Sequence, residues 1–278
     1  MRSASRRSRA GILTAAALLT AGGPLAAGTV PATAAATAVT VPVQACPAEQ
    51  TGPGQPPLAA APASVALPDG VTPPPTAAVY AARYPGEVHY LVAPGGWTCD
   101  VAFFGADGGE QAYVHPGAPV ADPASARFTS VVRAVFVSGG VQTDIDLACG
   151  FIPQAGAAPN TCLAPAHLPA DQLHPVATHA PGLLLTAVGV PSNTREPNLP
   201  TTGGPDRTVA LVVFPPPGGP AQEITCTIPA ASAPIPTCQA ALGHFLATGA
   251  AAEQLTPADL SAALHDLNAF VAAYLAQP

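Results

Sequence analysis

The chain has 278 residues, with nine basic side chains against 16 acidic ones and a net charge of −7. All nine basic residues are arginines, and four of them lie within residues 1–9. The rest of the chain therefore carries five arginines against 16 acids, a net charge of −11. Nucleic acids and anionic membranes attract basic surfaces, so this balance argues against both as partners. Apolar residues make up 49% of the chain, which argues against disorder driven by charge.

The N-terminus has the three parts of a secretory signal peptide in order. The basic segment Met1–Arg9 precedes the apolar run Ala10–Thr20, and small residues then lead to Ala36-Thr37-Ala38, a site of the kind that signal peptidase cleaves. The apolar run is shorter than the roughly 20 residues that cross a bilayer. The sequence therefore predicts export with removal of residues 1–38, and no transmembrane segment.

Residues 39–85 are predicted to form a proline-rich N-terminal arm. Residues 47–75 hold nine prolines and no periodic apolar pattern, which favours extended coil with polyproline II character. Thr76–Tyr84 is predicted as a short helix that ends at Pro85-Gly86. Residues 86–278 are then expected to form a single β-rich domain.

Within that domain, apolar and β-branched runs alternate with Gly and Pro turn signals, which predicts antiparallel strands. Residues 153–182 form a second proline-rich coil between them. Gly139-Gly140 is predicted to join two of these strands, 128–137 and 142–151, in a hairpin. The expected strands are 88–93, 98–104, 111–114, 128–137, 142–151, 183–190, 208–214 and 222–228.

The C-terminal segment changes to helical periodicity. Cys238–Thr248 is expected to form one helix. A second opens with Thr256 as N-cap, Pro257 in the first turn and Asp259 at a position that favours an acid. Its apolar stripe of Leu260, Leu264, Leu267, Val271 and Tyr274 should pack on the sheet and leave Ser261, His265 and Asn268 in water. The predicted fold class is α+β: a β-rich antiparallel sheet or sandwich with two C-terminal helices, stapled by disulfides.

Six cysteines, an even number, in an exported chain imply three disulfides. The alternative is a zinc site, which typically needs close pairs such as C-x2-C, and the sequence contains none. Strand, Gly-Gly turn, strand, Cys, Ile-Pro and Thr-Cys occur in this order in 128–162 and again in 208–238. Chance similarity in a biased composition is the alternative to an internal duplication. If the duplication is real, the bridges Cys149–Cys162 and Cys226–Cys238 are equivalent, and Cys46–Cys99 follows by elimination.

Four groups of residues are weak candidates for chemistry. His167, Asp171, His174 and His179 include metal-ligand types, but they lie in a proline-rich segment, and a solvated loop is favoured. Asp144 and Asp146 share one face of a predicted strand, where a solvated strand face is commoner than a calcium or acid–base site. Asp107-Gly-Gly-Glu110 near His115 fits a hairpin turn better than a general base beside a histidine. For Tyr80, Tyr84, Tyr90 and Trp97, core packing is favoured over ligand binding.

Two segments resemble the exported, Ala/Pro-rich proteins of actinobacteria. They are Trp97-Thr-Cys-Asp100 through Gly105–Gly109, and Cys226-Thr-Ile-Pro229 through Cys238. This resemblance implies an extracellular location and disulfides, and no activity. The order strand, Cys226, Pro229, Cys238 and a helix with Leu242 resembles the subtilisin-inhibitor family over fewer than about twenty residues, and no reactive-site residue is transferred from that family.

The sequence thus predicts a secreted, non-enzymatic protein that binds an unknown extracellular ligand or protein or has a structural role, with no catalytic, cofactor or metal site assigned. Only His89 and His115 fall near the predicted sheet, and no serine or free cysteine neighbours either of them, so no hydrolytic triad is expected. The alternatives are a secreted hydrolase with an unrecognised Asp/His site and a protease-inhibitor-like binder. A pocket with a titratable group of shifted pKa would favour the hydrolase, and a flat patch of exposed aromatic residues would favour a binder. A rigid exposed loop beside a disulfide would favour an inhibitor.

Overall fold

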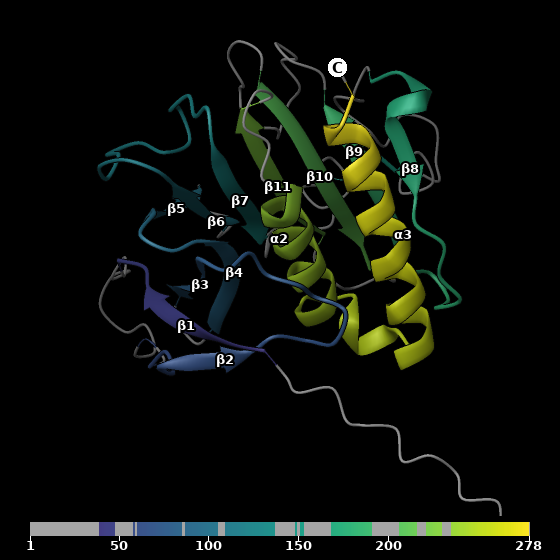
Figure 1. Ribbon diagram of the computed structural model, residues 1–278, viewed down its shortest axis with the longest axis horizontal. Coiled ribbons are helices and arrows are strands. Elements are labelled where there is room, and N and C mark those ends of the chain that lie inside the picture. The colour runs from purple at the N-terminus through teal and green to yellow at the C-terminus, as the bar shows by residue number, and fades with distance from the viewer. Residues whose placement is uncertain are drawn as a thin grey trace, which may run out of the picture. The chain divides into compact units, whose positions relative to one another are not determined.

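The computed structural model confirms the β-rich α+β fold with two C-terminal helices (Figure 1). Neighbouring strands pair in antiparallel fashion, except for one parallel pair between β1 and β3. The structure describes residues 39–47, 58, 60–84, 87–104, 109–136, 148, 151–152, 168–190, 206–215, 221–229 and 235–277.

The predicted arm, residues 39–85, contributes three strands to a four-stranded sheet of order β2-β1-β3-β4. The strands of this sheet are β1 (Thr40–Ala45), β2 (Ser64–Ala66), β3 (Ala77–Tyr84) and β4 (Glu87–Pro94). The helix predicted over 76–84 is therefore wrong. Its alanines favour a helix locally, but β3 pairs with β4 from Ala77↔Pro94 to Tyr84↔Glu87 and is buried along most of its length. Tertiary pairing thus overrides local propensity at this segment.

The larger sheet has seven strands in the order β5-β6-β7-β11-β10-β9-β8. Its members are β5 (Thr98–Phe104), β6 (Gly109–His115), β7 (Val131–Phe136), β8 (Leu173–Pro175), β9 (Leu184–Val190), β10 (Asp206–Phe214) and β11 (Gln222–Pro229). The predicted hairpin of 208–214 with 222–228 is confirmed as β10 with β11. The predicted proline-rich coil 153–182 contains the short β8 and the 3-10 turn η2 (Ala170–Gln172).

The predicted hairpin between 128–137 and 142–151 is wrong, because both edges of β7 are occupied by other strands. β7 pairs with β6 on one side and with β11, about 90 residues later in the chain, on the other. Within 142–151, the described Ala148 is helical and accepts hydrogen bonds from the backbone N–H groups of Phe151 and Ile152.

Two helices, α2 (Ile235–Thr248) and α3 (Pro257–Leu275), lie over one face of the seven-stranded sheet (Figure 1). The short 3-10 turn η3 (Ala252–Gln254) joins them. The predicted N-cap is confirmed, because the Thr256 hydroxyl accepts a hydrogen bond from the Asp259 backbone N–H. α2 contacts β4 of the small sheet as well as β10 and β11 of the large one. One hydrophobic core therefore joins both sheets and both helices.

The opposite face of the seven-stranded sheet carries a second apolar cluster and a row of polar side chains. Val135, Val212 and Val188 pack there with Phe151 and Ile152. Glu223 and Thr225 lie on the same face, since residues two apart on a strand point the same way. The sheet is thus buried on both sides, although antiparallel sheets commonly leave one face in water.

Candidate functional site

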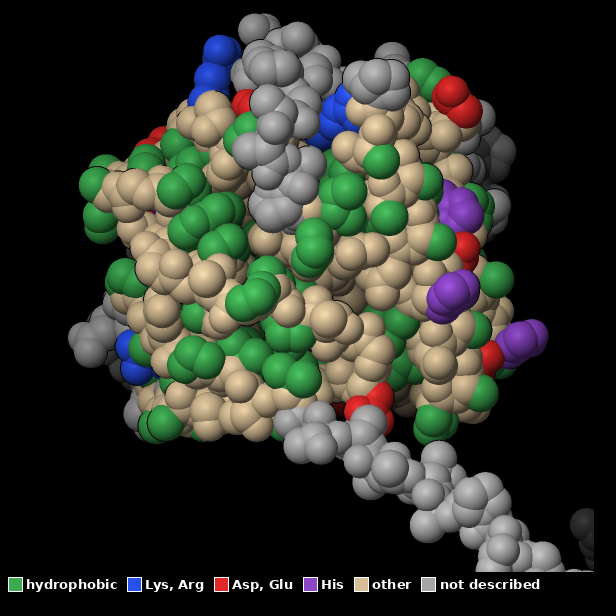
Figure 2. Space-filling view, in the orientation of Figure 1, with side chains coloured by type: hydrophobic (Ala, Val, Ile, Leu, Met, Phe, Trp, Pro, Cys, Tyr) green, Lys and Arg blue, Asp and Glu red, His purple; other side chains and the backbone are tan. Residues whose placement is uncertain are grey.

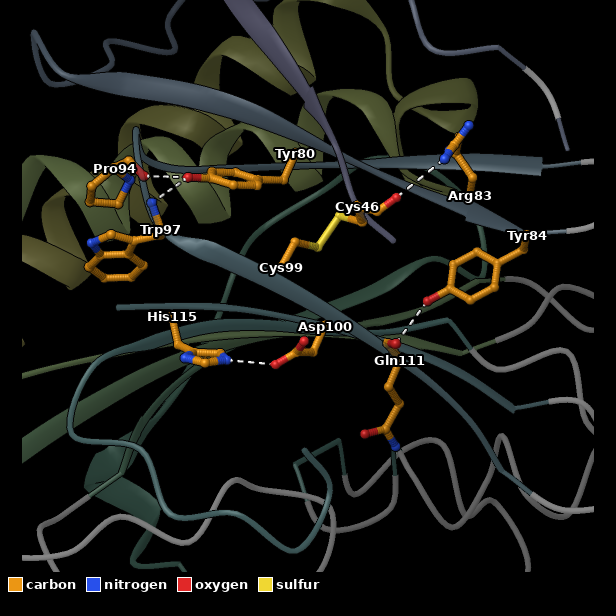
Figure 3. The surroundings of a disulfide bond; sticks show 10 residues. All are labelled: Cys46, Tyr80, Arg83, Tyr84, Pro94, Trp97, Cys99, Asp100, Gln111 and His115. Atoms are coloured by element: carbon orange, nitrogen blue, oxygen red, sulfur yellow. Dashed lines mark hydrogen bonds and ion pairs between the residues drawn. A yellow bond between two sulfur atoms is a disulfide. The ribbon is translucent and has the colours of Figure 1, made fainter. Parts of the chain in front are cut away.

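Two of the three predicted disulfides are present in the described part of the chain. Cys46 on the loop after β1 is joined to Cys99 on β5, and this bridge links the two sheets (Figure 3). Cys226 on β11 is joined to Cys238 in the first turn of α2, which anchors that helix to the sheet. Cys149 and Cys162 lie outside the described residues, so their pairing and the proposed duplication stay predictions.

A buried hydrogen-bonded pair lies beside Cys99. His115 Nε2 lies 2.8 Å from Asp100 Oδ2 (Figure 3). His115 Nδ1 lies 3.1 Å from the carbonyl oxygen of Pro116. Both ring nitrogens of His115 are thus engaged by oxygen atoms of Asp100 and Pro116. The arrangement differs from that of a catalytic histidine, in which one ring nitrogen contacts the hydroxyl or thiol of a nucleophile.

A groove of about 790 Å³ lies between the turn at residues 68–70, the end of α2 and the first half of α3. Its apolar wall includes Leu255, Leu260 and Leu264. Gly70 shapes the turn at a φ of +86°, a conformation that glycine adopts without steric cost. The polar side chains of the groove are Asp69, Ser261, His265 and Asn268, and no arginine lines it.

Ser261, His265 and Asn268 are the residues that the α3 periodicity placed on the side away from the core stripe. Ser261 and His265 are exposed, as predicted, while Asn268 is half-buried. The Asn268 side-chain oxygen is buried and has no hydrogen-bond partner, and its backbone oxygen accepts a hydrogen bond from Gln239. No hydrogen bond joins any two of Ser261, His265 and Asp69, all of which are described. The groove therefore holds nucleophile, base and acid types without the contacts that would make them a triad.

The most strongly shifted carboxyl group lies away from the groove. Glu223 is fully buried on β11, and burial raises its pKa to about 7, even though the Arg133 guanidinium at 3.0 Å lowers it. One carboxylate oxygen, Oε2, has no hydrogen-bond partner, and neither does the hydroxyl of Thr225. Arg133 also donates to Gln111 Oε1 at 3.2 Å. These side chains form a buried polar cluster on the sheet face opposite the helices.

The most strongly shifted histidine also lies outside the groove. His244 is buried on α2, and burial lowers its pKa to about 4, opposed by a hydrogen bond with the backbone of Tyr90. A histidine in this setting is neutral at physiological pH and packs as part of the core.

The structure brings together three potential metal ligands for which the sequence assigned no site. Glu87 and His89 lie on β4 of the small sheet, and Glu110 lies on β6 of the large one. One donor atom from each lies within 4.8 Å of the others. The predicted neighbour of Glu110 was His115, which instead pairs with Asp100. Asp107 lies outside the described residues.

The other histidine candidates are separated from one another. His174 Nε2 lies 2.9 Å from Asp266 Oδ1, and His179 Nδ1 lies 2.7 Å from Asp259 Oδ1, so both contact α3 rather than each other. Hydrogen bonds from His179 and then Thr256 lower the pKa of Asp259. Figure 2 shows histidine and acidic side chains gathered on this side of the molecule, near α3 and β8. His167, Asp144 and Asp146 lie outside the described residues, and Asp171 is in η2.

The aromatic group packs in the core, as predicted. Tyr80 and Tyr84 are fully buried, and Tyr90 and Trp97 pack against the same core. The Tyr80 hydroxyl donates to the carbonyl of Pro94 at 2.8 Å and accepts from the Trp97 backbone N–H at 2.9 Å. Among the described residues, no large aromatic side chain is exposed, so they form no flat aromatic binding patch.

No family model matches the chain, and no curated protein and no solved structure matches it either. Both family resemblances of the sequence therefore stay predictions. In the described part of the chain, no helix is both long and apolar enough to span a membrane.

Proposed function

We propose that this chain is an exported, non-catalytic binding protein whose ligand site is the groove between residues 68–70, α2 and α3. The observation that carries this proposal is the groove itself. Its volume of about 790 Å³ falls within the range of roughly 300 to 1,000 Å³ typical of small-molecule sites. Its lining combines apolar side chains with four polar ones in comparable surface area, and both kinds are found in such sites.

The lining also suggests the ligand class. The Asp69 carboxylate is an acceptor, and no arginine is present to bind an anion. The acidic balance of the whole chain disfavours anions further. The ligand is therefore a small molecule with both apolar and polar parts that is neutral or cationic and carries hydrogen-bond donors.

Binding is favoured over hydrolysis for two reasons. Glu223 and His244, the groups whose pKa values are displaced furthest, do not line the groove. A nucleophile also needs its base within about 3 Å, and Ser261 and His265 form no hydrogen bond with each other.

Export is supported by the two disulfides, which persist in oxidising compartments. N-terminal sequencing of the protein recovered from the culture medium tests it. A chain that starts at Val39 is expected, whereas an intact Met1 in the medium would refute removal of residues 1–38.

The groove is tested with two fluorescent probes that share one fluorophore and differ in charge, dansylcadaverine (cationic) and dansylglycine (anionic). The cationic probe should bind about tenfold more tightly or better, a difference near 1.4 kcal/mol. Ser261→Phe fills the groove and should abolish binding. Ala262→Phe alters the next residue, which is also exposed but does not line the groove, and should leave binding intact. Equal effects of the two variants would place the site elsewhere.

The hydrolase alternative has its own readout. Release of p-nitrophenol from p-nitrophenyl acetate or butyrate should stay at the uncatalysed rate. Turnover that disappears in Ser261→Ala would replace the binding proposal with a hydrolase.

A further inference from the structure

One nitrogen and two carboxylates, contributed by strands of both sheets, lie close together. Glu87 begins β4 and His89 lies two residues later, so both side chains point to the same side of that strand. Glu110 reaches the same point from β6. The three side chains thus come from both sheets, near the position where the Tyr84 hydroxyl donates to the Gln111 carbonyl at 2.8 Å.

The spacing of the donor atoms suits ligands of a single ion. His89 Nε2 lies 3.2 Å from Glu87 Oε2 and 3.5 Å from Glu110 Oε2. Ligands about 2.1 Å from one metal ion lie roughly 3.0 to 3.4 Å from each other in tetrahedral or octahedral geometry. The distances of 3.2 and 3.5 Å are close to this range, and the two carboxylates place an oxygen atom within 4.8 Å of each other.

The orientation of His89 gives a second, independent observation. Its Nε2 atom is buried but makes no hydrogen bond, although two carboxylates lie near it. The nitrogen is therefore within ion-pair distance of both carboxylates without the geometry of a hydrogen bond to either. The ring is held in this orientation by stacking on Phe136 at 3.8 Å between centroids and 8° between planes. A buried, unsatisfied ring nitrogen is costly unless something occupies the space in front of it.

We infer that Glu87, His89 and Glu110 bind a divalent transition-metal ion, with Zn²⁺ as the best fit, and that this ion ties the two sheets together. One imidazole and two carboxylates suit Zn²⁺, whereas Ca²⁺ takes oxygen ligands only. The side chains of His89 and Glu110 are 19% and 16% exposed, while that of Glu87 is 68% exposed. The solvent side of the ion therefore keeps at least one position for water. The site is separate from the groove, so neither depends on the other.

The test is equilibrium dialysis of the metal-stripped, disulfide-intact exported chain against Zn²⁺ and, in parallel, Ca²⁺. One Zn²⁺ per chain and no Ca²⁺ of comparable affinity is the expected result. Glu87→Gln and Glu110→Gln keep size and remove the charged ligand atom. Each should weaken Zn²⁺ binding about tenfold or more, since even partners outside the ligand shell change metal affinity by 10- to 100-fold. Glu87 is exposed, so its variant should fold normally.

The matched control is the double variant His174→Gln/His179→Gln, which removes two surface histidines that also lie beside carboxylates. It should leave the Zn²⁺ affinity unchanged. At one Zn²⁺ concentration, Zn²⁺ should raise the unfolding temperature of the wild-type protein and of this control by the same amount, and that of Glu110→Gln by less. A Zn²⁺ affinity that is unchanged in Glu87→Gln and Glu110→Gln, or that is lost in the control, would overturn the assignment. Absence of Zn²⁺ binding to the wild-type chain would overturn it too and leave the three residues as an ion-pair cluster only.

Discussion

Asp100 and His115 form a buried hydrogen-bonded pair across the β5–β6 hairpin, with 2.8 Å between Oδ2 and Nε2. The same carboxylate oxygen accepts a hydrogen bond from the Val120 backbone N–H at 2.9 Å, which ties the loop after β6 to the pair. His115 also packs on Phe128, with 4.4 Å between ring centroids. The pair thus stabilises the hairpin next to the Cys46–Cys99 bridge.

Replacing one member of this pair should destabilise the protein strongly. Asp100→Ala or His115→Gln disrupts the hydrogen bond between two buried side chains, and a buried polar group left without its partner typically costs about 1–3 kcal/mol. Urea unfolding measures the change in the free energy of unfolding. His174→Gln is the control, because its partner Asp266 is partly exposed and such pairs contribute about 1 kcal/mol or less. Similar losses for His115→Gln and His174→Gln would contradict the structural role of the buried pair.

The two described disulfides should differ in their contribution to stability. Cys46–Cys99 spans 53 residues and Cys226–Cys238 spans 12. The chain-entropy model gives about 4 kcal/mol for the longer loop and about 3 kcal/mol for the shorter one. Removing each bridge by a double Cys→Ala substitution should therefore lower the urea midpoint more for Cys46/Cys99. The reverse order would show that strain or residual structure in the unfolded chain dominates.

Glu223 should make the protein less stable as pH rises from about 4.5 toward about 7. Its pKa is about 7 in the folded state against an ordinary value of 4.5, so the folded state holds the proton more tightly over this window. The free energy of unfolding therefore falls as pH rises, because the charged carboxylate must then be buried. The difference in unfolding free energy between wild type and Glu223→Gln, measured at several pH values, should show this slope. A difference that does not vary with pH would contradict the raised pKa.

His244 should make the protein more stable as pH rises, which is the opposite of the effect of Glu223. Its pKa is lowered from 6.5 to about 4 by burial, so the unfolded chain binds a proton between these values more readily than the folded one. The stability present above pH 6.5 is then lost as pH falls toward 4. His244→Gln should remove this acid sensitivity, and the double variant Glu223→Gln/His244→Gln should be nearly flat across both windows. If His244→Gln still loses stability as pH falls toward 4, another titratable group causes that loss.

Gly189 on β9 should be intolerant of any side chain. A Cβ atom at this position would overlap the ring of Tyr274 on α3, so Gly189→Ala should force that ring out of its packed position, at a cost of about 1–3 kcal/mol. Gly243→Ala on α2 is the control, because its Cβ would meet Leu264 and Val71 at ordinary distances of 3.4 and 3.6 Å. That change should be neutral or stabilising by up to about 1 kcal/mol, as expected for Gly→Ala in a helix. Recovery of stability in Gly189→Ala/Tyr274→Ala would identify the ring as the obstacle.

Local signals in the sequence determined the elements whose partners lie nearby in the chain. The β10–β11 hairpin was predictable because two β-branched runs flank a short Pro/Gly turn. The start of α3 was predictable because Thr256 and Pro257 act within one turn. The two cysteines of the Cys226–Cys238 bridge are also close in sequence, since they are 12 residues apart.

Only the tertiary structure decided which distant segments meet. Ala77–Tyr84 became a strand because β1 and β4 flank it, and β7 took β11 rather than the following segment as its neighbour. Arg133 and Glu223, 90 residues apart, share a buried pair for the same reason. Both candidate sites depend on such meetings: Glu110 reaches His89 across two sheets, and the turn at Asp69 lies over the α3 face that carries Ser261. Propensity and periodicity act over a few residues, whereas the choice of a strand neighbour depends on how much apolar surface the whole chain buries at once, which a local pattern does not encode.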